Sequence, residues 1–240
     1  MLDAAYYDKL GLKTVYEKVL HGERLSAEDG LALFNTPDPT AVGALALHRR
    51  LALHGDKTFY VVNRQINYTN ICVNGCLFCA FRRDALDDAD AFLLTKDDII
   101  RRLEDAKNSA LHLDELHIVG GCHPKLRLAF FEDLFETIRT IAPDLPIKAF
   151  TPVEIDHFSK LEHCSSKEVL ERLKARGLLM MRGGGAEIFD ETLRKKLCPH
   201  KADSKTWLRI SGEAHELGIK TNCTMLFGHL ETYAHRVDHL

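Results

Sequence analysis

The chain of 240 residues contains no apolar run of the roughly 18–20 residues that a membrane-spanning helix needs. Its N-terminus, MLDAAYYDKLGLK, lacks the basic segment followed by an apolar segment that marks a secretory signal. The formal net charge is −3, and Lys and Arg are scattered along the chain, so no basic surface for nucleic acid is indicated. These absences predict a cytoplasmic protein with neither a membrane nor a nucleic acid among its partners.

In a reducing cytosol the seven cysteines are more typical of metal ligands than of disulfides. Cys72, Cys76 and Cys79 lie together in the segment NICVNGCLFCAF, with no fourth cysteine and no histidine within ten residues on either side. Three thiolates suit a 4Fe–4S cluster, in which each cysteine holds one iron and the fourth iron stays open. A zinc site, which normally has four ligands, or chance clustering is the alternative.

The four other cysteines are scattered, and we expect them to be small buried residues rather than ligands. They are Cys122, on a predicted active-site loop, and Cys164, Cys198 and Cys223.

Hydrophobic residues make up 45% and charged residues 28% of the chain, as in ordinary globular proteins. Residues 1–55 have a helical pattern and are predicted to form an N-terminal helical extension. From residue 56 onward, β-rich and helical segments alternate. The predicted strands lie within residues 58–69, 115–121, 147–151, 178–185 and 219–228.

Strands that alternate with helices predict an α/β protein with a parallel sheet. Five such strands favour a (β/α) TIM-type barrel over residues 56–240, in which chemistry sits at the C-terminal ends of the strands. The last residues, GHLETYAHRVDHL, stop within an amphipathic helical pattern that has no C-cap. We therefore expect a barrel truncated after its fifth strand and a chain that is part of a longer protein.

A C-x3-C-x2-C triplet at the end of a first barrel strand resembles the signature of the radical S-adenosylmethionine superfamily. The resemblance implies that the open iron binds the amino and carboxylate groups of S-adenosylmethionine, which is then cleaved reductively to methionine and a 5′-deoxyadenosyl radical. It also implies that reduced flavodoxin or ferredoxin supplies the electron.

The same resemblance implies further contacts to S-adenosylmethionine at three places. Gly120 and Gly121 in VGG match the glycine pair that binds the methionine amino group. Glu154 in TPVEI stands where a polar residue often meets the ribose or the methionine. A third set matches the adenine-contacting motif of the fifth strand: Leu226, Gly228 and Glu231, with Thr224 in place of the usual first glycine.

Several separate blocks, among them NRQINYTNICVNGCLFCAF, ELHIVGGCHP and IKAFTPVEIDHF, narrow the resemblance to the aminofutalosine synthase family of menaquinone biosynthesis. The family's reaction adds the 5′-deoxyadenosyl radical to 3-[(1-carboxyvinyl)oxy]benzoate, the enolpyruvyl ether of 3-hydroxybenzoate, and gives 6-amino-6-deoxyfutalosine. Cyclic dehypoxanthine futalosine synthase and the related deazaflavin-forming radical enzymes are the sibling alternatives. The alternative from another class is a zinc-binding or electron-carrying module without catalysis.

This chain departs from the family pattern at two positions. Gln65 stands where the family commonly has His, and Arg182 stands where it commonly has Pro before the glycines. Arg182 either helps to hold a carboxylated substrate or reaches solvent.

The remaining candidates for substrate contacts lie on the strands or at their ends. We predict catalytic contacts from His123, His229 and Arg64, with Asn67 beside Arg64 on the first strand. Glu187 in GGGAE is a candidate hydrogen-bond partner for a ribose hydroxyl.

Overall fold

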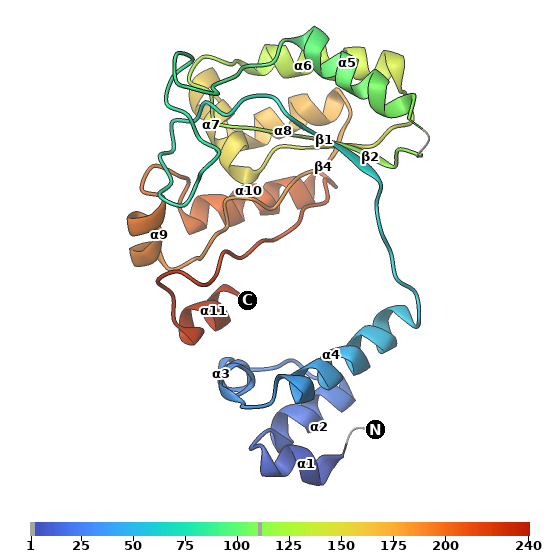
Figure 1. The fold of residues 1–240 in the computed structure, drawn as a ribbon, viewed down its shortest axis with the longest axis vertical. Helices are drawn as coiled ribbons and strands as arrows, with labels where there is room; N and C mark the ends of the chain where they lie inside the picture. Colours follow the sequence, from blue (N-terminus) through green and yellow to red (C-terminus); the bar gives the residue numbers. More distant parts are fainter. Residues whose placement is uncertain (1–2, 110–111) are drawn as a thin grey trace. The chain divides into compact units, whose positions relative to one another are not determined.

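The computed structural model describes residues 3–109 and 112–240, which divide into two compact units (Figure 1). The first unit comprises Met1–Tyr60 and Phe227–Leu240, and the second comprises Val61–Leu226. The sequence placed everything after residue 55 in the barrel, whereas the structure groups the C-terminal segment with the N-terminal helices. Met1 and Leu2, which the predicted extension includes, lie outside the described residues.

The first unit is helical. Its helices are α1 (Ala4–Lys9), α2 (Lys13–His21), α3 (Ala27–Asn35), α4 (Pro39–His54) and α11 (Tyr233–His239). Ser26 begins α3 with a capping box to Asp29. Asp38 caps α4 directly before Pro39, a residue that favours the first helical position. A small core forms from Tyr7, Leu12, Val15, Ala41 and Leu45.

The second unit contains one parallel sheet in the order β1-β2-β3-β4. Its strands are β1 (Asn63–Asn67), β2 (Glu115–Val119), β3 (Ile147–Ala149) and β4 (Leu178–Met180). Its helices are α5 (Lys96–Lys107), α6 (Leu128–Ile141), α7 (Pro152–Glu162), α8 (Ser166–Ala175), α9 (Glu191–Leu197) and α10 (Ser204–Glu216). Among the helices in the described parts of the chain, none has the length and apolar character that a membrane crossing requires.

One face of this sheet packs against helices and forms the main core. Ile66, Ile118 and Ala149 point to this face from three strands, and each is fully buried. Phe131 on α6 meets Tyr68 and Phe150 edge to face, with ring centroids 4.8 Å apart in both pairs. Because side chains alternate along a strand, the residues between these apolar positions point to the opposite face.

The opposite face of the sheet carries polar side chains. Gln65 on β1 pairs in register with His117 on β2, and His117 pairs with Lys148 on β3. Strands in a sheet lie about 4.8 Å apart, so these three residues form one row across the sheet. The parallel α/β architecture predicted from the sequence is therefore confirmed, with an apolar helix-covered face and a polar face.

The predicted fifth strand at residues 219–228 is absent from the described structure. Lys220 makes only an isolated bridge to Met180, and the following residues bond to the loop after β4 instead. A Cβ atom on Gly183 would lie 2.3 Å from the carbonyl oxygen of Asn222, so only glycine permits this close approach. The segment therefore runs against a loop, where no continuous ladder forms.

Two helices of the second unit were not predicted. α7 begins directly after β3, at a position that the sequence analysis treated as a strand-end loop. α9 follows the glycine-rich segment after β4 and is short.

Candidate functional site

One cavity of about 310 Å³ gathers residues that follow all four strands of the second unit. Six of the residues predicted to bind the cluster or S-adenosylmethionine line it: Cys72, Cys76, Cys79, Gly120, Gly121 and Glu154. Asn67 and Glu187, two further candidates, also line this cavity. We refer to it as the cysteine cavity.

Backbone hydrogen bonds fix the cysteine loop. The Cys79 N–H donates to the Cys76 carbonyl at 3.2 Å, which closes a tight turn between two of the thiols. The Cys72 N–H donates to the Arg83 carbonyl at 3.1 Å, and the Val73 N–H donates to the Cys122 carbonyl at 3.1 Å. The loop is thus held by its own return segment and by the turn after β2.

The surroundings of the thiols favour a thiolate at one position. A hydrogen bond from the Cys122 thiol lowers the pKa of Cys72 to about 5, so Cys72 is a thiolate at neutral pH. Burial raises the pKa of Cys76, and the nearby Lys201 ammonium opposes that effect. Thiolates are the form that binds iron.

Lys201 brings a cation to the same cavity. Its Nζ lies 2.5 Å from Oε1 of Glu187, and both side chains are only 13% exposed. The ammonium also lies 5.3 Å from the ring centroid of Phe78, which stands between Cys76 and Cys79. Lys201 therefore links the cysteine loop to the loop after β4.

The three thiols fit a cluster better than a single ion. Within residues 3–109 and 112–240, no group of three or more Cys, His, Asp or Glu side chains is arranged to hold one metal ion. Thiolates of a 4Fe–4S cluster bind three different irons, so they need to surround a volume rather than converge on a point. Three free cysteines on one cavity meet that requirement.

The turn after β2 packs tightly against the cysteine loop. A Cβ atom on Gly121 would lie 2.2 Å from the carbonyl oxygen of Ile71, so no larger residue fits there. The Gly121 N–H donates to the Thr69 carbonyl at 2.9 Å. This glycine therefore has a packing role that does not depend on a bound ligand.

Glu154 is buried, with 2% exposure, and binds donors from three strand ends. Its Oε1 accepts from the Tyr68 hydroxyl at 2.8 Å and from the Gly120 N–H at 3.1 Å. Its Oε2 accepts from the N–H and the hydroxyl of Thr151, which completes the capping box of α7. Burial raises the pKa of Glu154 to about 7, while these hydrogen bonds act in the opposite direction.

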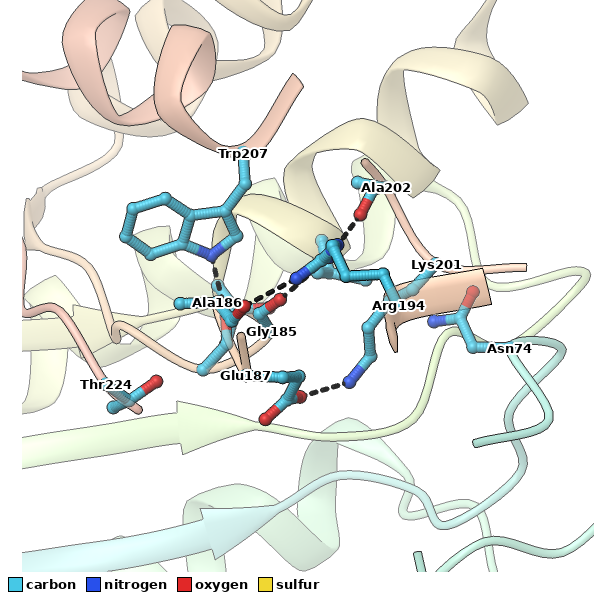
Figure 2. A network of polar contacts seen from close by, with 12 residues as sticks. Asn74, Gly185, Ala186, Glu187, Arg194, Lys201, Ala202, Trp207 and Thr224 are labelled. Carbon is cyan, nitrogen blue, oxygen red and sulfur yellow. Dashed lines mark hydrogen bonds and ion pairs between the residues drawn. The ribbon is translucent and has the colours of Figure 1, made fainter. Parts of the chain in front are cut away.

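Arg194 on α9 organises the glycine-rich loop after β4 (Figure 2). Its guanidinium is buried and donates to four backbone carbonyl oxygens, those of Gly185, Ala186, Ile188 and Ala202. Three of these carbonyls belong to the loop, and Trp207 on α10 adds a fourth contact to it, because its Nε1–H donates to the Gly184 carbonyl at 3.1 Å. The loop that carries Glu187 is therefore held by residues of two helices, α9 and α10.

A second cavity of about 550 Å³ adjoins the first, and both include Val119, Thr151 and Gly184 in their linings. Gln65, His117, Lys148 and Arg182 line this second cavity, which we call the cationic cavity. The two departures from the family pattern contact each other there, because Arg182 Nη1 donates to Gln65 Oε1 at 2.9 Å.

Two predicted catalytic residues do not line either cavity. Arg64 points to the same face of β1 as the buried Ile66, because it lies two residues away. His123 is buried, and its Nδ1 accepts from the Lys125 N–H at 3.1 Å. Its ring is thus held by its own loop.

Of Leu226, Gly228 and Glu231, which are expected to contact adenine, only Leu226 belongs to the unit that contains the cysteine cavity. Leu226 does not line it, although its N–H donates to the Glu187 carbonyl at 2.7 Å. Gly228, His229 and Glu231 belong to the other compact unit. There, the Glu231 carboxylate accepts from the backbone N–H groups of Gly228 and His229 and pairs with Arg236.

The sequence analysis missed Lys148, His117, Lys201 and Arg194 as residues of the site. A signal existed for the first two, since each is a polar residue at an alternate position of a short apolar strand, in IKA and ELHIV. Lys201 and Arg194 gave no local signal, because their partners lie 6 to 14 residues away on loops whose path no periodic pattern specifies.

Comparison with known proteins identifies the class. The family model of the radical SAM superfamily matches residues 66–240. The chain therefore belongs to this superfamily, which uses a 4Fe–4S cluster and S-adenosylmethionine. The crystal structure of the FeFe-hydrogenase maturase HydG from Carboxydothermus hydrogenoformans has a similar fold. Its TM-score is 0.71 at 18% sequence identity, covering 97% of this chain and 52% of that chain.

Particular relatives fall into two groups. The aminodeoxyfutalosine synthases of Thermus thermophilus and Streptomyces coelicolor are 42% and 39% identical over 94% and 96% of this chain. A 5-amino-6-(D-ribitylamino)uracil–L-tyrosine 4-hydroxyphenyl transferase of Methanocaldococcus jannaschii is 42% identical over 78% of this chain. The chain spans 60%, 59% and 52% of the lengths of these three relatives.

The buried Glu154 carboxyl predicts a pH-dependent stability. Its pKa of about 7 lies above the ordinary value of 4.5, so between these values the folded chain holds a proton that the unfolded chain has released. Its contribution to stability therefore falls as pH rises from about 5 to about 8. We expect the free energy of unfolding of Glu154→Gln, measured by urea denaturation, to lack this fall, which reaches at most ~1.4 kcal/mol per pH unit. Equal slopes for the variant and the wild-type chain would contradict this, and the exposed Glu171→Gln is the control.

Arg194 provides a second prediction. In Arg194→Lys the ammonium cannot reach four carbonyl oxygens in fixed directions, so some remain buried without a donor. We expect a loss of about 3 kcal/mol or more in the free energy of unfolding. Emission from Trp207, the only tryptophan, should shift because its partner Gly184 lies in the same loop. An unchanged spectrum and stability, as expected for the exposed Lys195→Arg, would show that the loop does not need the guanidinium.

Proposed function

We propose that this chain carries the radical chemistry of an aminofutalosine synthase. The observation that carries the proposal is the cysteine cavity, where the whole C-x3-C-x2-C triplet faces the turn after β2 and the loop after β4. We further propose that the four-stranded sheet is part of a (β/α) barrel. The consecutive parallel strand order and the helix-covered outer face support this architecture.

In this proposal Cys72, Cys76 and Cys79 each bind one iron of the cluster. The bound cluster would supply an open iron for S-adenosylmethionine and the single electron that cleaves it to methionine and the adenosyl radical. Phe78 and Phe81 line the cavity beside the thiols and would partly shield a bound cluster from water. Reduced flavodoxin or ferredoxin is the proposed electron donor.

The turn after β2 has a defined part in binding S-adenosylmethionine. The N–H groups of Gly120 and Gly121 already donate to Glu154 and to the Thr69 carbonyl. The methionine amino group donates, so its partners on this turn in the proposal are backbone carbonyl oxygens. Glu154 acts here by fixing the turn, and Glu187 is the carboxylate left to meet a ribose hydroxyl.

The second substrate is proposed to be 3-[(1-carboxyvinyl)oxy]benzoate, and the product 6-amino-6-deoxyfutalosine. Two relatives named aminodeoxyfutalosine synthase, which align with nearly the whole chain, support this choice. A second candidate is the deazaflavin-forming transfer from L-tyrosine, favoured by the relatives that carry that name at similar identity.

Cysteine substitution tests the proposal directly. We expect the anaerobically reconstituted chain to bind roughly four irons and four sulfides and to cleave S-adenosylmethionine when reduced. Cys76→Ala should lose most of the iron and at least about 100-fold in cleavage rate, because only two ligands remain. Cys164→Ala, which removes a thiol outside both cavities, is the matched control.

Full cleavage by Cys76→Ala would overturn the proposal, and bound zinc without sulfide would favour the non-catalytic alternative. Mass spectrometry of reactions with the enolpyruvyl ether or with L-tyrosine separates the two candidate functions. The first substrate should yield an adduct that retains the adenosyl group.

A further inference from the structure

The cationic cavity has an unbalanced charge. Lys148 and Arg182 line it, and no Asp or Glu is among its lining residues. Within the described residues, no hydrogen bond or ion pair engages the Lys148 ammonium. A concave site with two cations and no acid attracts an anion and disfavours a group of positive charge.

Arg182 is held in a defined orientation. One of its nitrogens, Nη1, donates both to Gln65 Oε1 at 2.9 Å and to His117 Nδ1 at 2.6 Å. For its other two nitrogens, no hydrogen bond is found in residues 3–109 and 112–240. The guanidinium is therefore anchored on one side and keeps a two-nitrogen edge for a ligand, the geometry that binds a carboxylate through two bonds.

His117 accepts the hydrogen bond that orients Arg182. An arginine only donates, so His117 Nδ1 must accept and the ring proton must be on Nε2. Nε2 lies 2.6 Å from Oε2 of Glu115, which accepts that proton's hydrogen bond. Burial lowers the pKa of His117, which keeps the ring neutral at neutral pH. In this chain of hydrogen bonds Arg182 donates to His117, and His117 donates to Glu115.

The register of the sheet places Lys148 beside this chain. Gln65, His117 and Lys148 are direct neighbours on three adjacent strands, and Arg182 follows the fourth. Lys148 on β3 and Arg182, two residues after the end of β4, therefore both line this cavity. The cavity adjoins the cysteine cavity through Val119, Thr151 and Gly184, so an anion held here lies next to the proposed radical source.

We propose that the cationic cavity binds a carboxylate of the second substrate through Arg182 and Lys148, with His117 and Glu115 as positioning residues for Arg182. This inference rests on the proposed function for the identity of that substrate. It also predicts a preference: a dicarboxylate without an amine suits this lining, whereas the ammonium of an amino acid finds no acid among the lining residues.

Isophthalate, an aromatic dianion, and isophthalamide, its uncharged counterpart, are suitable probes for calorimetry on the reconstituted chain. We expect isophthalate to bind at least about tenfold more tightly than isophthalamide or L-tyrosine. Arg182→Gln and Lys148→Gln should each weaken isophthalate binding at least about tenfold and leave isophthalamide unchanged. Lys196→Gln, which removes an exposed cation outside the cavity, is the control.

His117 has its own test. In His117→Asn a carbonyl oxygen replaces Nδ1 as the acceptor, so isophthalate affinity should stay within about threefold of the wild-type value. His117→Leu removes the acceptor and should lose about tenfold, although Lys148 and Arg182 are intact. Equal losses in both variants would contradict the positioning role.

Two outcomes overturn the carboxylate site: no measurable isophthalate binding to the wild-type chain, or equal binding of the diacid and the diamide. Both are measured on the wild-type chain and do not depend on how the variants fold. Reductive cleavage of S-adenosylmethionine by the same samples reports on the proposed function separately. If the chain cleaves S-adenosylmethionine but binds isophthalate and isophthalamide equally, the carboxylate site is refuted and the proposed function is not.

Discussion

The carboxylate of Glu154 is the interaction on which the geometry of the site depends. It accepts hydrogen bonds from Tyr68 after β1, from Gly120 after β2 and from Thr151 after β3. A buried carboxylate without these donors would be costly, and each donor would be costly without the carboxylate. The ends of three parallel strands are therefore held in one arrangement. The cysteine loop leaves from the first of these ends, so its position relative to the glycine turn follows from the same contact.

The two adjoining cavities differ in the charge of their lining residues. The cysteine cavity contains thiols, one of them a thiolate at neutral pH, and its cations Lys201 and Arg82 are paired with Glu187 and Asp84. The cationic cavity has two cations and no lining acid. Parallel strands bring the segments after all four strands to one edge, while the alternation of side chains points polar residues into the cationic cavity. The thiols thus lie in the cysteine cavity, and the groups that attract an anion lie in the cationic cavity.

Local patterns in the sequence predict part of the fold and of the site. The remaining features depend on contacts between segments that are distant in the sequence. The cysteine triplet is local, and the structure places all three cysteines on one cavity. TPVE was also a local signal, a capping box with proline at the first helical position. It was interpreted as a ligand loop, so the start of α7 was missed. Arg64 is predicted to contact the substrate from the first strand, although the two-residue period puts it on the face of Ile66. The row formed by Gln65, His117 and Lys148 depends on strand register, which no local pattern specifies.

In the proposed function, Cys72, Cys76 and Cys79 hold a cluster with one iron open to S-adenosylmethionine. Electron–nuclear double resonance on the reduced, reconstituted chain tests this, with S-adenosylmethionine isotope-labelled at its amino nitrogen or carboxylate carbon. We expect a hyperfine coupling between the labelled nucleus and the cluster, absent from Cys76→Ala and retained in Cys164→Ala. A cluster that forms on the wild-type chain but shows no coupling to either label would rule out binding of S-adenosylmethionine at the open iron.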